Sequence, residues 1–305
     1  MKTIVRQSKR RAAFTIVELL TVMSIIVILI GLLVPALNKV RIYAKEVTQS
    51  AQFHSMDAAI ELFNNAFDGY PESSALDPMR TNYCGAMKLC EAMMGQDLLG
   101  FHSNSIFNAD GTDAMGVPCY DPADLSARKG PFLPADSANA FIMSDIYGSS
   151  IGPFGATNFV LCDVFTRRLA TGVKAGMPIL YYKANPANAI HRYDVKKNIH
   201  MPIDTENSDG NIYNYFDNHA LVGLGKPWET GGTSHKLFED PLASPPEAPG
   251  VRFYINTKNA QIARPWRPYR ADSYILISAG YDGEYGTADD ICNYNWKYMN
   301  AEPAP

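Results

Sequence analysis

The apolar run from Ala13 to Leu37 constrains this chain more than any other feature of its sequence. No charged residue lies between Leu19 and Leu37, a length close to the roughly 20 apolar residues with which a helix crosses a bilayer core. Basic residues precede the run at Lys2, Arg6, Lys9, Arg10 and Arg11. Because basic flanks stay on the cytoplasmic side of a membrane, the sequence predicts one span, with residues 1–13 inside and the remainder outside.

One acidic residue, Glu18, lies near the start of this run. A carboxylate inside a membrane helix costs about 2.5–3.5 kcal/mol on insertion scales, so a partner and a purpose are expected for it. A secretory signal is one alternative, but its apolar core has about 7–15 residues and is followed by a small-residue cleavage site. A plain signal anchor is the other alternative, and it leaves Glu18 unexplained.

The basic leader, the sequence Phe14-Thr15-Ile16-Val17-Glu18 and the long apolar run resemble the type IV pilins and the type II secretion pseudopilins. The resemblance implies cleavage by a prepilin peptidase between Ala13 and Phe14, followed by N-methylation of Phe14. Glu18 would then be the fifth residue of the mature chain. Ala13 stands where the family usually has glycine, and Pro35 stands where many pilins carry a proline.

The resemblance implies a structural role and no enzymatic activity. Subunits would be stored in the inner membrane with their globular part in the periplasm. They would assemble with copies of themselves, other pseudopilins and a membrane assembly platform into a pseudopilus of a type II secretion system. The charged amine of Phe14 and the Glu18 carboxylate of a neighbour would pair in the apolar filament core, where each alone is unfavourable. A minor pilin of a type IV pilus or of a DNA-uptake system shares this logic.

The apolar helix is predicted to continue beyond the membrane. Residues 38–67 contain no glycine or proline, and their apolar residues recur mostly at helical spacing at Val40, Tyr43, Val47, Ala51, Ala58, Leu62 and Phe67. We therefore expect one helix from residue 14 to residue 67, about 80 Å long at 1.5 Å per residue. Pro35 favours a kink, and Gly69 is expected to end the helix in a left-handed conformation before Pro71.

The sequence predicts an α+β fold, with a leader (1–13), a transmembrane helix (14–37), its periplasmic continuation (38–67) and a globular domain (68–305). Residues 83–94 have a helical pattern, and residues 229–250 have the composition of a long surface loop. Short apolar runs bounded by turn residues predict strands at 158–161, 178–182, 251–255 and 273–278. We expect the outer half of the long helix to pack on an antiparallel sheet.

The C-terminal run 278–296 gathers four carboxylates, Asp282, Glu284, Asp289 and Asp290, between glycines. Calcium takes six to eight oxygen ligands from such tight acidic loops. The run also resembles the calcium loop of the major type II pseudopilin. That resemblance implies Asp282, Asp289 and Asp290 as side-chain ligands, and carbonyl oxygens around Ala279 would complete the shell. Glu284 is a further candidate ligand. A solvated acidic hairpin is the alternative.

Other candidate sites are weaker. The chain has five cysteines, of which Cys84 and Cys90 are nearest in sequence and form the first disulfide candidate. Buried reduced thiols are the alternative. Gly148-Ser149-Ser150-Ile151-Gly152 fits the nucleophile motif of serine hydrolases, which needs a strand before it and a helix after it. A membrane-anchored hydrolase using Ser150 is therefore a further alternative. A net charge of −4 argues against nucleic-acid binding through a basic surface.

Overall fold

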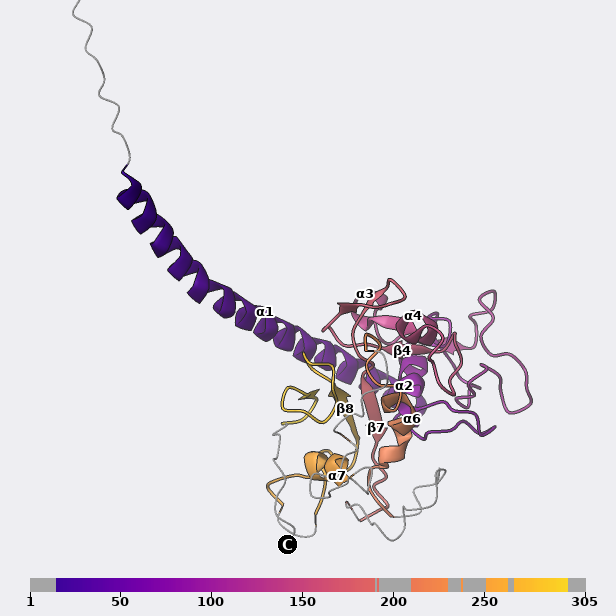
Figure 1. The fold of residues 1–305 in the computed structure, drawn as a ribbon. Helices are drawn as coiled ribbons and strands as arrows, with labels where there is room; N and C mark the ends of the chain where they lie inside the picture. The colour runs from indigo at the N-terminus through magenta and orange to yellow at the C-terminus, as the bar shows by residue number, and fades with distance from the viewer. Residues whose placement is uncertain are drawn as a thin grey trace, which may run out of the picture. The chain divides into compact units, whose positions relative to one another are not determined.

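The computed structural model describes residues 15–189, 191, 210–229, 237, 251–262 and 266–295 (Figure 1). Ala13, Phe14 and nearly all of the predicted loop 229–250 therefore lie outside the described residues. The chain divides into two compact units, Met1–Ala44 and Lys45–Pro305. The described part combines one long N-terminal helix with short helices and small antiparallel sheets, so the predicted α+β class is confirmed.

Helix α1 (Ile16–Phe67) runs for 52 residues and continues through Pro35. Its last part belongs to the second unit, Lys45–Pro305, which we call the globular unit. There Phe53, Met56, Ile60 and Phe63 are buried among residues of the sheets. The ring of Phe63 meets that of Phe101 edge to face, with centroids 5.1 Å apart. The expected packing of the outer helix against a sheet is thus confirmed.

The face of α1 that packs is not the one formed by the apolar residues at helical spacing. Ala51, Ala58 and Leu62 are exposed, whereas the buried face begins with Gln49 and Gln52. The Gln52 amide donates to the carbonyl of Cys162 (3.0 Å), and the side-chain oxygen of Gln49 accepts from the N–H of Val164 (3.0 Å). Apolar spacing alone does not reveal the packed face, because two polar side chains on it are buried with backbone partners.

The end of α1 also differs from the prediction in its detail. Asp68, not Gly69, has a positive φ, of 55°. Aspartate is one of the few residues other than glycine that occupies the left-handed region with some frequency. The helix therefore ends where the sequence predicts, and the residue before the glycine makes the turn.

The central sheet contains β7 (Leu180–Lys183), β8 (Tyr274–Ser278) and β9 (Ile291–Cys292) in the order β7-β8-β9, all antiparallel. Its register places Leu180 opposite Ile277 and Ile277 opposite Cys292. All five residues of β8 are buried. A strand buried on both faces reads as a continuous apolar run, which is why the predictions for 178–182 and 273–278 are confirmed.

Short two-stranded ladders surround this sheet. They pair β1 (Phe101–His102) with β2 (Arg128–Lys129), β3 (Ala140–Ile142) with β4 (Phe159–Leu161), and β5 (Arg167–Arg168) with β6 (Lys174–Ala175). Strand β4 confirms the prediction for 158–161. The remaining short elements are α3 (Ala135–Ala138), α4 (Met143–Tyr147), η1 (Tyr215–Asn218) and α6 (His219–Val222).

Helix α2 (Gly85–Met94) confirms the helical prediction for 83–94 and is buried along its whole length. It lies beside β4 and β7 at the centre of the globular unit (Figure 1). Gly85 allows this close approach, because a Cβ atom there would collide with the carbonyl oxygen of Tyr181 on β7. The two ionisable residues of α2, Lys88 and Glu91, are consequently drawn into the core.

The strand predicted at 251–255 is wrong, because α7 (Val251–Thr257) occupies this segment. Phe253 and Tyr254 are both fully buried, and each has a partner in the core. The Phe253 ring packs on Tyr182, with centroids 4.7 Å apart, while the Tyr254 hydroxyl donates to the carbonyl of Tyr213 (3.2 Å). Tertiary contacts therefore override the β-propensity of this run.

Candidate functional site

Glu18 forms a reciprocal set of hydrogen bonds at the start of α1. The N–H and hydroxyl of Thr15 both donate to Glu18 Oε2, at 2.9 and 2.8 Å, and the Glu18 N–H donates to Thr15 Oγ1 at 3.2 Å. This is a capping box, in which residues three positions apart satisfy free N–H groups at a helix start. The Thr-x-x-Glu spacing is visible in the sequence, and the sequence reasoning missed it.

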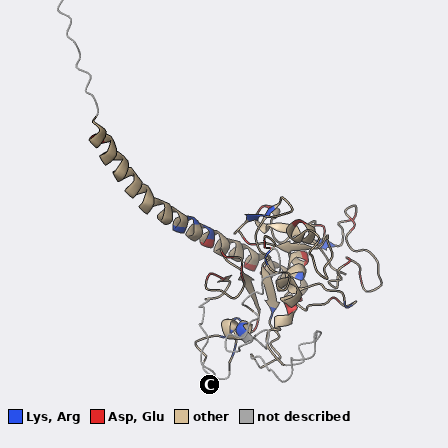
Figure 2. Cartoon of the chain, in the orientation of Figure 1, with Lys and Arg blue, Asp and Glu red and all other residues tan. Residues whose placement is uncertain are grey.

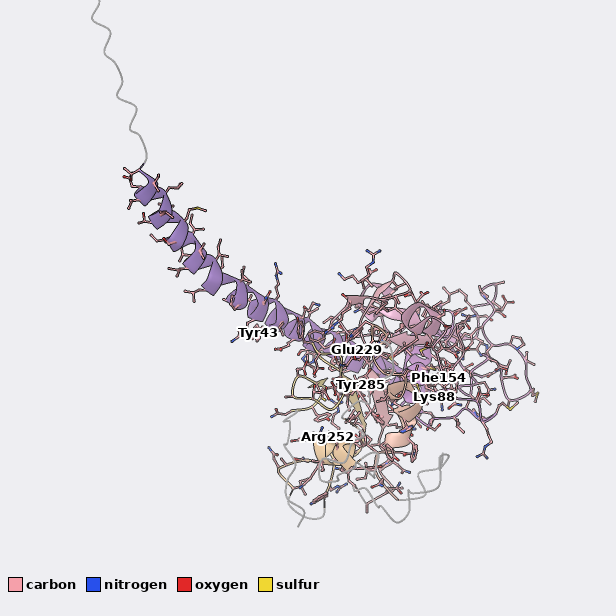
Figure 3. All side chains as sticks on the ribbon, viewed as in Figure 1. Tyr43, Lys88, Phe154, Glu229, Arg252 and Tyr285 are labelled. Carbon is pink, nitrogen blue, oxygen red and sulfur yellow. The ribbon has the colours of Figure 1, made fainter. Side chains whose placement is uncertain are left out.

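None of the described residues covers the apolar helix around Glu18. Every residue of α1 from Ile16 to Leu37 is exposed, and side chains extend freely along this part of the helix (Figure 3). It is the one helix of the described residues that is long and apolar enough to cross a membrane. An apolar surface of this extent requires lipid or other apolar helices around it.

After Glu18, the next charged residues of α1 come where the apolar run ends. Figure 2 shows basic positions that appear near the middle of the helix. Most of the apolar residues at helical spacing in residues 38–67 are exposed: Val40, Tyr43, Val47, Ala51, Ala58 and Leu62. The helix therefore carries an apolar row that the described residues do not bury.

The predicted acidic residues lie in the loop that joins β8 to β9. Asp289 Oδ2 accepts from the N–H of Asp282 (2.9 Å), and Asp282 Oδ1 accepts from the N–H of Glu284 (2.7 Å). Burial, and then the adjacent Asp289 carboxylate, raise the pKa of Asp282. The loop therefore brings Asp282 and Asp289 together at an electrostatic cost that a cation would remove.

Asp290 and Glu284 are placed differently from this pair. Asp290 is 4% exposed, and its Oδ2 accepts from the N–H of Gly286 (2.7 Å) while Oδ1 has no hydrogen-bond partner. Glu284 faces the ammonium of Lys226 at 3.4 Å. The fully buried Ala279 begins the loop directly after β8.

These donors fit a calcium ion in part. Asp282 and Asp289 supply paired carboxylates, and Asp290 supplies an unpartnered buried oxygen. Among the described residues, however, no three His, Cys, Asp or Glu side chains converge closely enough to hold a metal ion. Calcium coordination here would therefore draw on backbone carbonyls, which calcium accepts readily.

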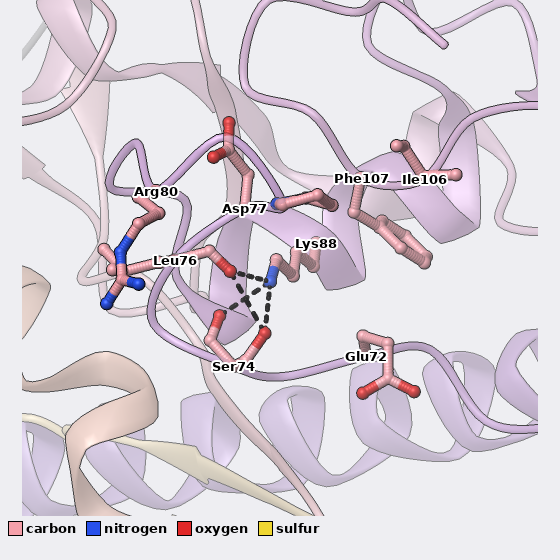
Figure 4. Close-up of a pocket in the computed structure, with 9 residues that line it drawn as sticks. Glu72, Ser74, Leu76, Asp77, Arg80, Lys88, Ile106 and Phe107 are labelled. Atoms are coloured by element: carbon pink, nitrogen blue, oxygen red, sulfur yellow. Dashed lines mark hydrogen bonds between the residues drawn. The ribbon is translucent and has the colours of Figure 1, made fainter. Parts of the chain in front are cut away.

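A cavity of about 330 Å³ opens beside α2 and was not predicted (Figure 4). The buried Lys88 ammonium donates to the Ser74 carbonyl (2.8 Å), the Ser74 hydroxyl (2.6 Å) and the Leu76 carbonyl (2.8 Å). Burial lowers the pKa of Lys88. All three of its N–H donors are nevertheless used, so Lys88 holds the segment 74–76 in place and does not activate Ser74 as a base would.

The Glu91 carboxylate, on the next turn of α2, also has a full set of hydrogen-bond partners. It accepts hydrogen bonds from Tyr83 (2.8 Å), Gln96 (3.1 Å), Tyr120 (2.7 Å) and Ser105. Burial raises the pKa of Glu91, and these donors oppose that shift. The partners come from separate loops, which explains why sequence reasoning could not find this cluster.

The predicted Cys84–Cys90 disulfide is wrong. Both residues are free, as are Cys119, Cys162 and Cys292. Cys84 caps the N-terminus of α2, and Cys90 lies within that helix. Six positions along a helix span about 9 Å, farther than a disulfide reaches. The alternative of buried reduced thiols holds for both, and burial raises the pKa of Cys84 to about 11.

Ser150 lacks the context of a nucleophile elbow. The motif needs a strand directly before it, but α4 occupies that position and β3 lies before α4, so a helix precedes the motif. Turns follow it, and Gly148 and Gly152 both have positive φ, at 61° and 60°. Ser150 is exposed in this turn, and the strand–turn–helix arrangement of the motif is absent from this fully described segment.

No protein-family model matches the chain, and neither the curated proteins nor the solved structures include a significant match.

Proposed function

We propose that this chain is a structural subunit of a pilus-like filament of the type II secretion class. A prepilin peptidase cleaves it between Ala13 and Phe14 and methylates the new amine. The mature subunit is held by a single span in the inner membrane, with its globular unit in the periplasm. An assembly platform then extracts it into a filament with copies of itself and other pseudopilins.

The observation that carries this proposal is the position of Glu18. It lies on the apolar part of α1 in which every residue from Ile16 to Leu37 is exposed, and among the described residues only Thr15 donates to its carboxylate. A carboxylate in lipid or in an apolar bundle is costly without a counter-charge. The amine of Phe14 from a neighbouring copy would supply that charge and fix the axial register of the helices.

The exposed apolar row of α1 supports the same proposal. Val40, Tyr43, Val47 and Leu62 are each more than half exposed, although they follow helical spacing. In a filament, this row would be covered by helices of neighbouring subunits. The globular unit would then form the outer layer.

Calcium binding by the β8–β9 loop is a further part of the proposal. Asp282 and Asp289 would bind the ion, with Asp290 and backbone carbonyls near Ala279 completing the shell. Glu284 already has Lys226 as a partner. This acidic loop favours the secretion branch over the second candidate function, a minor pilin of a type IV pilus or DNA-uptake system.

The test is processing in cells that carry a prepilin peptidase. Intact-mass and N-terminal sequencing should show a chain that begins at N-methylated Phe14, and the leader should persist when the peptidase is inactivated. An Ala13→Gly variant serves as a positive control for the site. Retention of the leader in both strains, with Ala13→Gly also uncut, would contradict the proposal.

A further inference from the structure

A cluster of positive charges lies on the globular unit at the point where α1 enters it. Lys45 is the first residue of this unit, and Arg167, Arg168 and Lys174 come from the β5–β6 hairpin. Burial lowers the pKa of Lys45, and the positive charges of Lys174 and Arg167 lower it further. Segments far apart in the sequence therefore place like charges together.

The hairpin itself holds two of these charges against each other. Arg168 pairs directly with Lys174 across the antiparallel ladder, and both side chains are exposed. Like charges at directly opposed positions destabilise a β-ladder. Within the described residues, no ion pair involves Lys45, Arg168 or Lys174.

Arg167 is fixed in place beside them. Its guanidinium donates to the carbonyl of Tyr281 (2.8 Å) and lies over the ring of Trp228, with 4.5 Å to the centroid. Asp163 is an acid that acts electrostatically on Lys45 and opposes the effect of the two cations on its pKa. The carboxyl group of Asp163 is fully buried and accepts from Ser278 and from the N–H groups of Phe165 and Met177. Within the described residues it forms no ion pair with Lys45, so it offsets the charge of the cluster only in part.

Two further acids adjoin the cluster: Asp282 follows Tyr281, whose carbonyl accepts from Arg167, and Glu46 follows Lys45 directly on α1. Successive side chains on a helix point about 100° apart, so Glu46 and Lys45 do not share one face of α1. The cluster thus keeps an excess of positive charge on the hairpin side. Its repulsion would be relieved by an external anion.

We propose that Lys45, Arg167, Arg168 and Lys174 bind the headgroups of anionic phospholipids in the membrane that anchors the chain. Leu37 ends the apolar run, and eight further helical residues, about 12 Å, lead to Lys45. Basic residues near an anionic membrane surface each contribute about 1 kcal/mol, and the attraction decays within a Debye length of about 10 Å at 0.1 M salt. The inference rests on the membrane anchoring of the proposed function.

The test uses the full chain in nanodiscs of phosphatidylcholine, with or without phosphatidylglycerol. Hydrogen exchange of the segment 166–175 should slow only when phosphatidylglycerol is present, and 1 M salt should remove the protection. Removing two charges, by Arg168→Gln with Lys174→Gln, should reduce the protection up to about thirtyfold. The matched control is Arg80→Gln with Arg267→Gln, two exposed arginines outside the cluster.

Equal protection in both lipids, or the same loss in the control variant, would overturn the proposal. So would displacement of the lipid contact by short duplex DNA at equal phosphate concentration, because a nucleic acid would then be the favoured ligand. Failure of the anchoring itself is recognised separately, since the chain would then not co-purify with nanodiscs of either composition.

Discussion

Two glutamates in this molecule lie in apolar surroundings but differ in the hydrogen-bond partners that the chain provides for their carboxylates. Glu91 is buried in α2, and four side chains of the same chain donate to it. Glu18 lies on the exposed apolar part of α1, where Thr15 alone among the described residues donates to it. The first site is complete within the chain, and the second has capacity for another molecule.

Substitution of Glu18 should have the largest effect. Glu18→Gln retains the capping box, which accepts Gln as well as Glu, but removes the charge, while Glu18→Ala removes both. We expect both variants to insert in the membrane and to yield no filaments by sedimentation and electron microscopy. Glu46→Gln, on the same helix, is the control. Normal filaments from Glu18→Gln would reduce Glu18 to a helix cap and end the comparison.

Substitution of Glu91 should act on folding instead. Glu91→Ala leaves the buried hydroxyls of Tyr83, Ser105 and Tyr120 without their acceptor, which costs about 3–5 kcal/mol for a broken buried network. Urea unfolding measures this loss. Glu72→Ala breaks an exposed pair with Lys183 (2.6 Å) and should cost less than about 1 kcal/mol. Equal losses in the two variants would show that the network around Glu91 does not stabilise the fold.

Calcium removal tests whether the β8–β9 loop is complete within the chain, as the Glu91 site is, or needs an outside partner, as we propose for Glu18. At a hundred times its dissociation constant, a bound ion adds about 2.7 kcal/mol of stability. We expect a chelator to lower the melting temperature of the native chain, and Asp282→Asn with Asp289→Asn to abolish this response. Asp136→Asn, at an exposed position elsewhere, should respond like the native chain. An unchanged melting temperature on chelation would leave a solvated hairpin as the description of this loop.

The buried Asp217 should make the free energy of unfolding depend on pH. Burial raises its pKa from 3.8 to about 8, while Ser73 and Lys88 oppose the shift. Between these values the folded chain keeps a proton that the unfolded chain has released, so stability falls as pH rises from about 4 to about 8. The slope is at most about 1.4 kcal/mol per pH unit. Asp217→Asn should flatten this part of the curve in denaturant titrations, and an unchanged slope would show that Asp217 is ionised in the fold.

The sequence predicted the elements whose patterns are local. Helix α1 and strand β8 follow from uninterrupted apolar runs, and α2 follows from its helical spacing. The packed face of α1 could not be predicted, because Gln49 and Gln52 are buried through backbone partners more than a hundred residues away. The same reason applies to α7, where packing overrides propensity.

The candidate site divides in the same way. Glu18 and the acidic loop were found because their residues lie close together in the sequence. The Lys88 and Glu91 clusters were missed because the chain brings their partners from several loops. The disulfide prediction failed because nearness in sequence gives the wrong geometry when the segment is helical.

Cross-linking within assembled filaments tests the central claim most directly. Filaments grown from an equal mixture of ¹⁴N- and ¹⁵N-labelled subunits would be treated with a carbodiimide, which joins an amine to a carboxylate in direct contact. We predict a cross-linked peptide between Phe14 and Glu18 that contains both isotopes, which identifies two different subunits. Filaments that yield this peptide only with a single isotope, or not at all, would contradict the pairing of Glu18 with a neighbouring chain.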